Sequence, residues 1–224
     1  MLPVDLLSAE AQAQAAIAAA LAADAQGRWT CEWRFEGLRL LPPVLRLLQA
    51  LDRPGQRVSL VFTDAGGAAL ARRDAPDLAD RIIDFRQLQQ RQPSEGVLLV
   101  VSPAAADYET FEALCQNHQG PVVMVNGRLE DAAVGIGSVA RERRRGFVAQ
   151  WKSAYALIPL EAGALRFAFP GEWEVYRQDP DGYRLAGTSN DKPDAEALAG
   201  LLDDSSGVGS TLRAVDSLIE GLRN

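Results

Sequence analysis

The sequence predicts an α/β fold built as a single domain over residues 1–224. We expect a three-layer arrangement around a parallel sheet in residues 1–150, then an antiparallel meander and C-terminal helices in residues 151–224. Two observations predict this division. In the first part, short apolar runs alternate with helical segments long enough to cross between parallel strands. In the second part, the links between apolar runs become too short for a crossover helix, so neighbouring strands must be antiparallel.

The N-terminal segment is predicted to be a helix followed by a strand. Asp5 or Ser8 can cap a helix that ends before Gly27, because small apolar residues recur in it at seven- and four-residue spacings. From Trp29 to Phe35, apolar residues then alternate strictly with polar ones. Such alternation is typical of a strand with one buried face.

Three further strands of the first part are short, apolar and without alternation, as expected of strands covered by helices on both faces. They are Val58–Phe62, Val97–Val101 and Val122–Val125. Helical stretches connect them, one beginning at Pro42 and one spanning residues 108–118, and Ile82–Phe85 can add a short edge strand. Right-handed connections of this kind place helices on both sides of the sheet, so the first part is predicted to be Rossmann-like.

The pattern changes after residue 150. Apolar runs now lie close together, separated by Gly163, by Pro170–Gly171 and by a turn signal at residues 179–182. The runs are Ala154–Leu160, Ala164–Phe169, Trp173–Gln178 and Tyr183–Ala186. Residues 193–202, and the segment that Ser210 caps, have the patterns of helices.

Charge and composition narrow the class of protein. A formal net charge of −7 disfavours DNA binding and makes RNA binding the least favoured function, unless a local basic patch overrides the average. No continuous apolar run reaches the length of a membrane span, and the N-terminus has no signal-peptide pattern. Cys31 and Cys115 stand alone, which indicates buried thiols in a reducing compartment, with a disulfide as the alternative. We therefore expect an intracellular protein without a transmembrane segment.

Two segments are candidates for anion binding, and the first is the loop with Asp64, Gly66 and Gly67. It follows the Val58–Phe62 strand and opens a helix. At this position of an α/β sheet, backbone N–H groups bind phosphate groups in many proteins. The loop lacks the spacings of the known phosphate-binding motifs, and a tight, closely packed turn explains its glycines equally well.

The second candidate combines a flexible turn with a run of arginines. Its residues are Gly135, Gly137, Ser138, Arg141, Arg144 and Arg145. In a helix, Arg141 and Arg145 share one face and Arg144 lies beside Arg141, so a helix N-terminus and guanidinium groups can converge on a phosphate or carboxylate. The alternative is a solvent-exposed helix face, with Phe147 and Trp151 turned toward the core.

No group of residues has the pattern of a catalytic or metal site, and we predict neither a cofactor nor a metal. His118 is the only histidine and follows a helix, where a positive charge would interact favourably with the helix dipole. The aspartates of the later turns are not paired as acid and base. The four tryptophans are most simply explained as core aromatics.

Several segments, in their order and spacing, resemble one protein family. They are Leu2–Pro3 with Ala11–Gln12–Ala13, Asp64–Ala65–Gly66 with Ala68–Ala69–Leu70, Pro121–Val125 with Asn126 and Leu129, Gly135–Gly137, Arg141 with Phe147, Tyr155, Arg166, and Phe169–Pro170–Gly171 with Trp173. Together they resemble the domain of unknown function 1995, over nearly the whole chain. That family is typical of cyanobacteria and chloroplasts and includes a plant low photosystem II accumulation factor. No catalytic residues carry over from it.

The resemblance implies a non-enzymatic assembly or regulatory protein of photosynthesis, cytoplasmic or stromal and in contact with the thylakoid surface. Its partners would be photosystem assembly or thylakoid-associated proteins. One candidate surface is the apolar stripe of the last predicted helix, which can equally pack on its own domain. The stripe consists of Leu212, Val215, Ile219 and Leu222. The alternative function is a nucleotide- or phosphometabolite-binding protein that uses both anion candidates.

Overall fold

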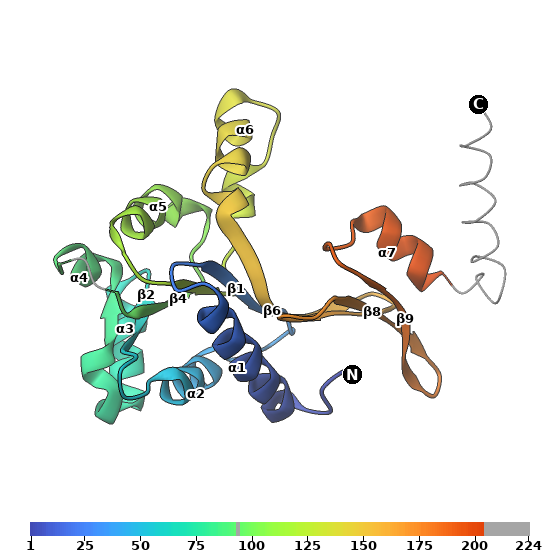
Figure 1. Ribbon diagram of the computed structural model, residues 1–224, viewed down its shortest axis with the longest axis horizontal. Coiled ribbons are helices and arrows are strands. Elements are labelled where there is room, and N and C mark those ends of the chain that lie inside the picture. Colours follow the sequence, from blue (N-terminus) through green and yellow to red (C-terminus); the bar gives the residue numbers. More distant parts are fainter. Residues whose placement is uncertain (93–94, 204–224) are drawn as a thin grey trace.

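Figure 1 shows the computed structural model of the chain, which describes residues 1–92 and 95–203. Its strands form one nine-stranded sheet in the order β3-β2-β4-β5-β1-β6-β7-β8-β9. The strands are β1 (Arg28–Trp33), β2 (Val58–Phe62), β3 (Ile82–Asp84), β4 (Val97–Val101), β5 (Val122–Val125), β6 (Trp151–Leu160), β7 (Gly163–Ala168), β8 (Trp173–Asp179) and β9 (Gly182–Ser189). The helices are α1 (Leu6–Ala23), α2 (Leu41–Leu51), α3 (Ala65–Asp74), α4 (Phe85–Gln89), α5 (Tyr108–Asn117), α6 (Ser138–Arg145) and α7 (Ala195–Leu202). Four 3-10 turns join them: η1 (Pro76–Arg81), η2 (Ala105–Asp107), η3 (Glu130–Ala133) and η4 (Val148–Gln150).

Six strands, from β3 to β6 in the sheet order, pair in parallel. Strands β2, β4 and β5 are buried along their full length, as their continuous apolar sequences predict. In β1 the alternation holds, with Trp29, Cys31 and Trp33 buried. The strand ends at Trp33, two residues earlier than predicted, which leaves Phe35 in the following loop.

Helices cover both faces of this parallel part, which confirms the predicted three layers. On one face, α1, α2 and α3 bury residues such as Ile17, Leu48 and Ala68 against the sheet. On the other face, α4 and α5 bury Phe85 and Phe111. Helix α6 differs from these helices, because it has no buried residue and rises away from the sheet (Figure 1).

Strand β6 joins the parallel part to the antiparallel part. Its residues 151–157 pair in parallel with β1, while residues 155–160 pair antiparallel with β7. Strands β7, β8 and β9 continue antiparallel, as predicted. Helix α7 lies on the same side of the sheet as α6 (Figure 1) and packs Leu198, Leu201 and Leu202 against this part. The parallel pairing of β6 with β1 was not predicted.

The single histidine has a different role from the expected one. His118 ends α5, but its ring is buried and its Nε2 atom lies 2.7 Å from the Gly96 carbonyl oxygen. Burial lowers the pKa of His118, and the nearby Arg28 lowers it further, so the ring is neutral at neutral pH. The positive charge at the end of α5 belongs instead to Arg28, whose guanidinium donates to the Cys115 carbonyl at 2.8 Å. The expectation of a charged His118 is therefore corrected.

The two cysteines are free and buried, as the sequence indicates.

Helix α1 requires a qualification of the membrane expectation. Among the described residues, Leu6–Ala23 has the length and the mean hydropathy, 1.3, that a membrane-spanning helix needs by length and composition alone. In the fold, α1 packs its alanine-rich face on the sheet, and 33% of this stretch is buried.

Candidate functional site

The Asp64 loop is a helix cap in the structure. Asp64 is the N-cap of α3, and its carboxylate accepts a hydrogen bond of 2.9 Å from the Gly67 N–H. A Cβ atom on Gly67 would lie 2.9 Å from the Phe62 ring, so the close approach of helix and strand requires glycine. The positive end of α3 already has a carboxylate from its own chain, which favours the tight-turn interpretation.

The arginine-rich segment forms a projection that we call the tower, residues 130–146, made of η3, a loop and α6 (Figure 1). Two of its arginines brace it. Arg143 donates to the Ala132 carbonyl at 2.9 Å and lies over the Tyr108 ring at 4.5 Å. Arg144 donates to the carbonyl oxygens of Ala133 and Gly135. These contacts hold the turn of the tower against its own helix.

Arg141 and Arg145, by contrast, are exposed, and within the described part of the chain no hydrogen bond or ion pair holds the side chain of either. The structure does not bring the two anion candidates together. Helix α3 packs on the α1 side of the sheet, whereas the tower rises from the opposite side, and the two stand apart in Figure 1. The apolar stripe Leu212, Val215, Ile219 and Leu222 lies outside the described residues.

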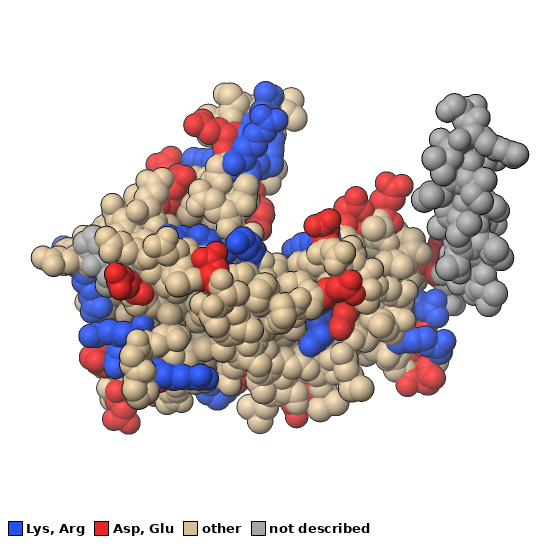
Figure 2. Space-filling model, in the orientation of Figure 1, with Lys and Arg blue, Asp and Glu red and all other residues tan. Residues whose placement is uncertain are grey.

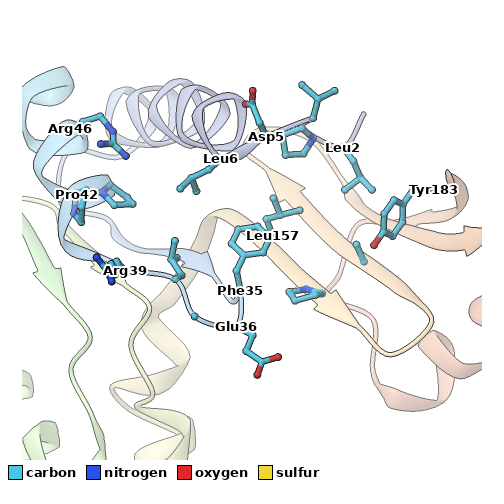
Figure 3. A pocket seen from close by; sticks show the side chains of 17 residues that line it. Leu2, Asp5, Leu6, Phe35, Glu36, Arg39, Pro42, Arg46, Leu157 and Tyr183 are labelled. Carbon is cyan, nitrogen blue, oxygen red and sulfur yellow. The ribbon is translucent and has the colours of Figure 1, made fainter.

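A cleft of about 680 Å³ opens beside the start of α1 (Figure 3), and we call it the N-terminal groove. Segments far apart in the sequence build it: the first residues, the loop from β1 to α2, and strands β6, β7 and β9. Its apolar lining includes Leu2, Leu6, Phe35, Pro42, Leu157 and Tyr183. In Figure 3, Phe35 and Leu157 lie at the middle of the groove, with Tyr183 at one end and Pro42 at the other.

The groove combines an apolar floor with a charged rim. Tyr183 is 53% exposed and Leu6 is 37% exposed, so apolar surface faces solvent along its length. Arg39 and Glu36 stand on the loop side of the rim. Arg46 at the far end pairs with the buried Glu10 through two hydrogen bonds of 2.6 Å. A groove of this kind fits an apolar segment with few charges.

A polar network adjoins the groove on the same face of the sheet. Arg166, which pairs with the groove residue Leu157 across β6 and β7, donates to the Gln12 side chain at 3.0 Å and to Glu174 at 2.7 Å. Tyr155 donates to the same Gln12 oxygen at 3.4 Å. The network therefore ties α1 to three strands beside the groove.

The electrostatics of the network favour a charged Arg166–Glu174 pair. Burial by itself would raise the pKa of Glu174, but the hydrogen bonds from Tyr176 and Arg166 outweigh it and lower that pKa. Burial, together with the hydrogen bond to Glu174, raises the pKa of Tyr176 to about 12. Both tyrosines of the network stay protonated at neutral pH, since burial also raises the pKa of Tyr155. The network is built to hold strands and helix, with no titration near neutral pH.

Comparison with known proteins gives the family. The family model described as "Domain of unknown function (DUF1995)" matches residues 3–200, which is most of the chain. The chain belongs to the DUF1995 family. No curated protein matches the chain.

In this DUF1995 chain, residues that carry the resemblance meet in space. Gln12, Tyr155 and Arg166 come from α1, β6 and β7, and they form the core of the polar network. Asn126 accepts from the Trp33 N–H at 2.7 Å and donates to the Trp33 carbonyl at 2.8 Å, so it joins the ends of β5 and β1. These residues hold the groove face and the sheet together.

A second cleft of the DUF1995 chain, of about 590 Å³, lies at the carboxyl ends of β1, β4 and β5. This is the edge at which parallel α/β sheets bind ligands. Strands β4 and β5 are each followed by a non-glycine residue with positive φ, Ser102 at 49° and Asn126 at 51°. Arg34 and Arg128 also line the cleft.

Within residues 1–92 and 95–203, no three His, Cys, Asp or Glu side chains could hold a metal ion together.

Sequence reasoning missed the groove. Some of its lining residues lie just outside helices and strands, as Leu2 does before α1 and Phe35 after β1, and the others come from five different elements. The only hint in the sequence was that apolar residues such as Leu2 and Phe35 lie beyond the ends of the elements next to them. Which of these residues meet depends on long-range packing, which no local pattern contains.

Proposed function

We propose that this DUF1995 protein is a non-catalytic assembly or regulatory protein that holds an apolar segment of a partner protein in the N-terminal groove. The observation that carries the proposal is the exposed apolar lining of the groove, set in a rim of both charges. Covering apolar surface of a partner is favourable because it removes that surface from water. The adjoining polar network keeps the groove walls fixed.

The partner that we propose is a membrane-protein subunit that is not yet assembled. Membrane-protein subunits expose apolar segments until they are assembled, and such segments have the chemistry that the groove fits. The family resemblance supports a subunit of photosystem II, or another thylakoid protein, as that partner. The protein would then act during biogenesis of the complex.

Affinity purification from a photosynthetic host tests the proposal. The tagged wild-type chain should recover photosystem or membrane-biogenesis components, and Leu6→Glu and Tyr183→Glu, which place a charge in the groove, should lose them. Leu70→Glu on α3 is the matched control, because Leu70 is 43% exposed and lies outside the groove. If none of those components is recovered, or if the groove variants recover them as well as Leu70→Glu does, the proposal is wrong.

A second candidate function is the binding of a small phosphorylated ligand at the carboxyl-end cleft. The observation in its favour is the pair of positive-φ residues, Ser102 and Asn126, beside the exposed Arg128. Calorimetric titration with nucleotides and sugar phosphates tests it. Binding that is lost in Arg128→Ala, and kept in Arg141→Ala on the tower, would support this cleft. Binding lost only in Arg141→Ala would place the ligand at the tower instead.

A further inference from the structure

The tip of the tower exposes three aliphatic side chains within six residues. Ile136 is 93% exposed, Val134 is 77% exposed and Val139 is 59% exposed. A folded protein gains no stability from such exposure, and clustered apolar residues on a surface usually mark a site of contact. The aliphatic tip is therefore the part of the tower that most needs an explanation.

The tower presents this tip on a braced stalk. Phe147 at its foot is buried and packs on Phe111 and Tyr108, with ring centroids 5.6 and 5.7 Å apart. Above this foot, Arg143 and Arg144 hold η3 and the loop against α6. Within the tower, Ala133 of η3 is buried, but α6 has no buried residue, so the core of the protein does not require this helix to be there.

Positive charge lies along α6, the helix that begins at the tip. Arg141 and Arg145 are exposed on α6, and side chains of a helix lean toward its N-terminus, which here is the tip. Figure 2 shows Lys and Arg side chains along one side of the tower, up to its end. The acidic residues of the tower are Glu130 and Asp131, on η3 in the other limb, and Glu142 on α6. The basic side of the tower contrasts with the net charge of −7 of the chain.

We infer that the tip of the tower docks on an anionic lipid bilayer. The aliphatic side chains of Ile136, Val134 and Val139 enter the boundary between headgroups and acyl chains, while Arg141 and Arg145 contact lipid phosphates. The charge of the whole chain opposes contact through other faces, so the tower also sets the orientation. This inference rests on the tip alone and is independent of the proposed function of the groove.

Flotation of the full chain with vesicles tests the inference. The wild-type chain should float with vesicles that contain phosphatidylglycerol, and much less with vesicles of phosphatidylcholine alone. Ile136→Ser should weaken partitioning by about tenfold, since it removes one buried aliphatic side chain from the bilayer. The double variant Arg141→Gln with Arg145→Gln should weaken it on anionic vesicles only, and added salt should do the same to the wild type. Leu7→Ser is the control: Leu7 is 65% exposed on α1, away from the tower, so this variant should bind as the wild type does.

A fluorescent label shows directly whether the tip enters the bilayer. Ile136→Cys can be labelled selectively with a polarity-sensitive dye, because Cys31 and Cys115 are buried and burial raises the pKa of the Cys115 thiol to about 12. Dye at position 136 should brighten and shift to the blue on anionic vesicles, whereas dye at Leu70→Cys should not change. These positions are exposed, so the substitutions leave the core intact.

Several results would overturn the inference. They are failure of the wild type to float, equal flotation of the wild type and the tip variants, and dye at position 136 that stays in water while the protein is bound. Flotation that requires a membrane protein in the vesicle, and is lost on pure lipid, would assign the tip to an acidic protein partner instead. None of these results changes what is expected of the groove variants.

Discussion

Arg28, the first residue of β1, caps the carboxyl end of α5. Its guanidinium donates to the Cys115 carbonyl oxygen, which the end of the helix leaves unpaired, and to the carbonyl oxygens of Gly120 and Gln26 in the neighbouring loops. Burial of His118, at the same helix end, lowers its pKa, and the charge of Arg28 lowers it further. A cation at a helix end need not come from the helix itself, which is why the sequence pattern assigned the charge to the wrong residue.

The buried His118 makes stability depend on pH. Because its pKa is lowered in the folded state, the unfolded state binds more protons below about pH 6.5, and stability falls as the pH drops through that range. Urea unfolding of the wild type and of His118→Gln should show a smaller loss of stability on acidification in the variant. An equal loss in both proteins would mean that another group is responsible.

The Glu10–Arg46 pair links α1 to α2 beside the groove. Glu10 is almost fully buried, whereas Arg46 is partly exposed, so Arg46→Leu leaves a buried carboxylate without its partner. We expect Arg46→Leu to destabilise the protein by roughly 2 kcal/mol, less than for a fully buried pair because water reaches Arg46. The double variant Glu10→Leu with Arg46→Leu should regain most of that loss in urea unfolding. A double variant no more stable than Arg46→Leu would contradict this account.

At the scale of elements, the sequence predicted most helices and strands, because their signals are local. The alternation in β1, the apolar runs of β2, β4 and β5, and the short links of β7 to β9 each correspond to an observed strand. What the pattern did not contain was pairing between distant segments. The parallel pairing of β6 with β1 and the convergence of Gln12, Tyr155 and Arg166 arise only when the chain is packed.

Two glycines near α7 should respond oppositely to replacement by alanine. A Cβ atom on Gly163 in β7 would lie 2.0 Å from the Tyr176 carbonyl oxygen, so Gly163→Ala should destabilise the fold by about 1–3 kcal/mol. Gly200 lies inside α7 with open space around it, so Gly200→Ala should stabilise by about 0.5–1 kcal/mol. Thermal unfolding of both variants measures the difference. Similar effects of the two changes would contradict the close approach of Gly163 to the Tyr176 carbonyl or the open surroundings of Gly200.

At the scale of the molecule, one sheet and one helix connect the two parts. Strand β6 belongs to both parts, and α1 packs on β1, β6 and β7. We therefore expect the parallel and antiparallel parts to unfold in a single transition. Tryptophan fluorescence and far-UV circular dichroism should give coincident urea curves, also in Trp173→Phe, which removes the reporter of the antiparallel part. Two separated transitions would show that the parts fold independently.

Strand β9 ends the sheet, and within the described residues no strand pairs with its outer side. Tyr183 and Leu185 are exposed on it, and Arg184 is the single charged residue of the strand, which contains neither proline nor lysine. Where residues 1–92 and 95–203 leave this edge unpaired, its backbone groups can template a strand from another molecule. Handling the protein at high concentration carries a risk of aggregation through this edge, and Leu185→Lys is the simplest change by which to reduce it.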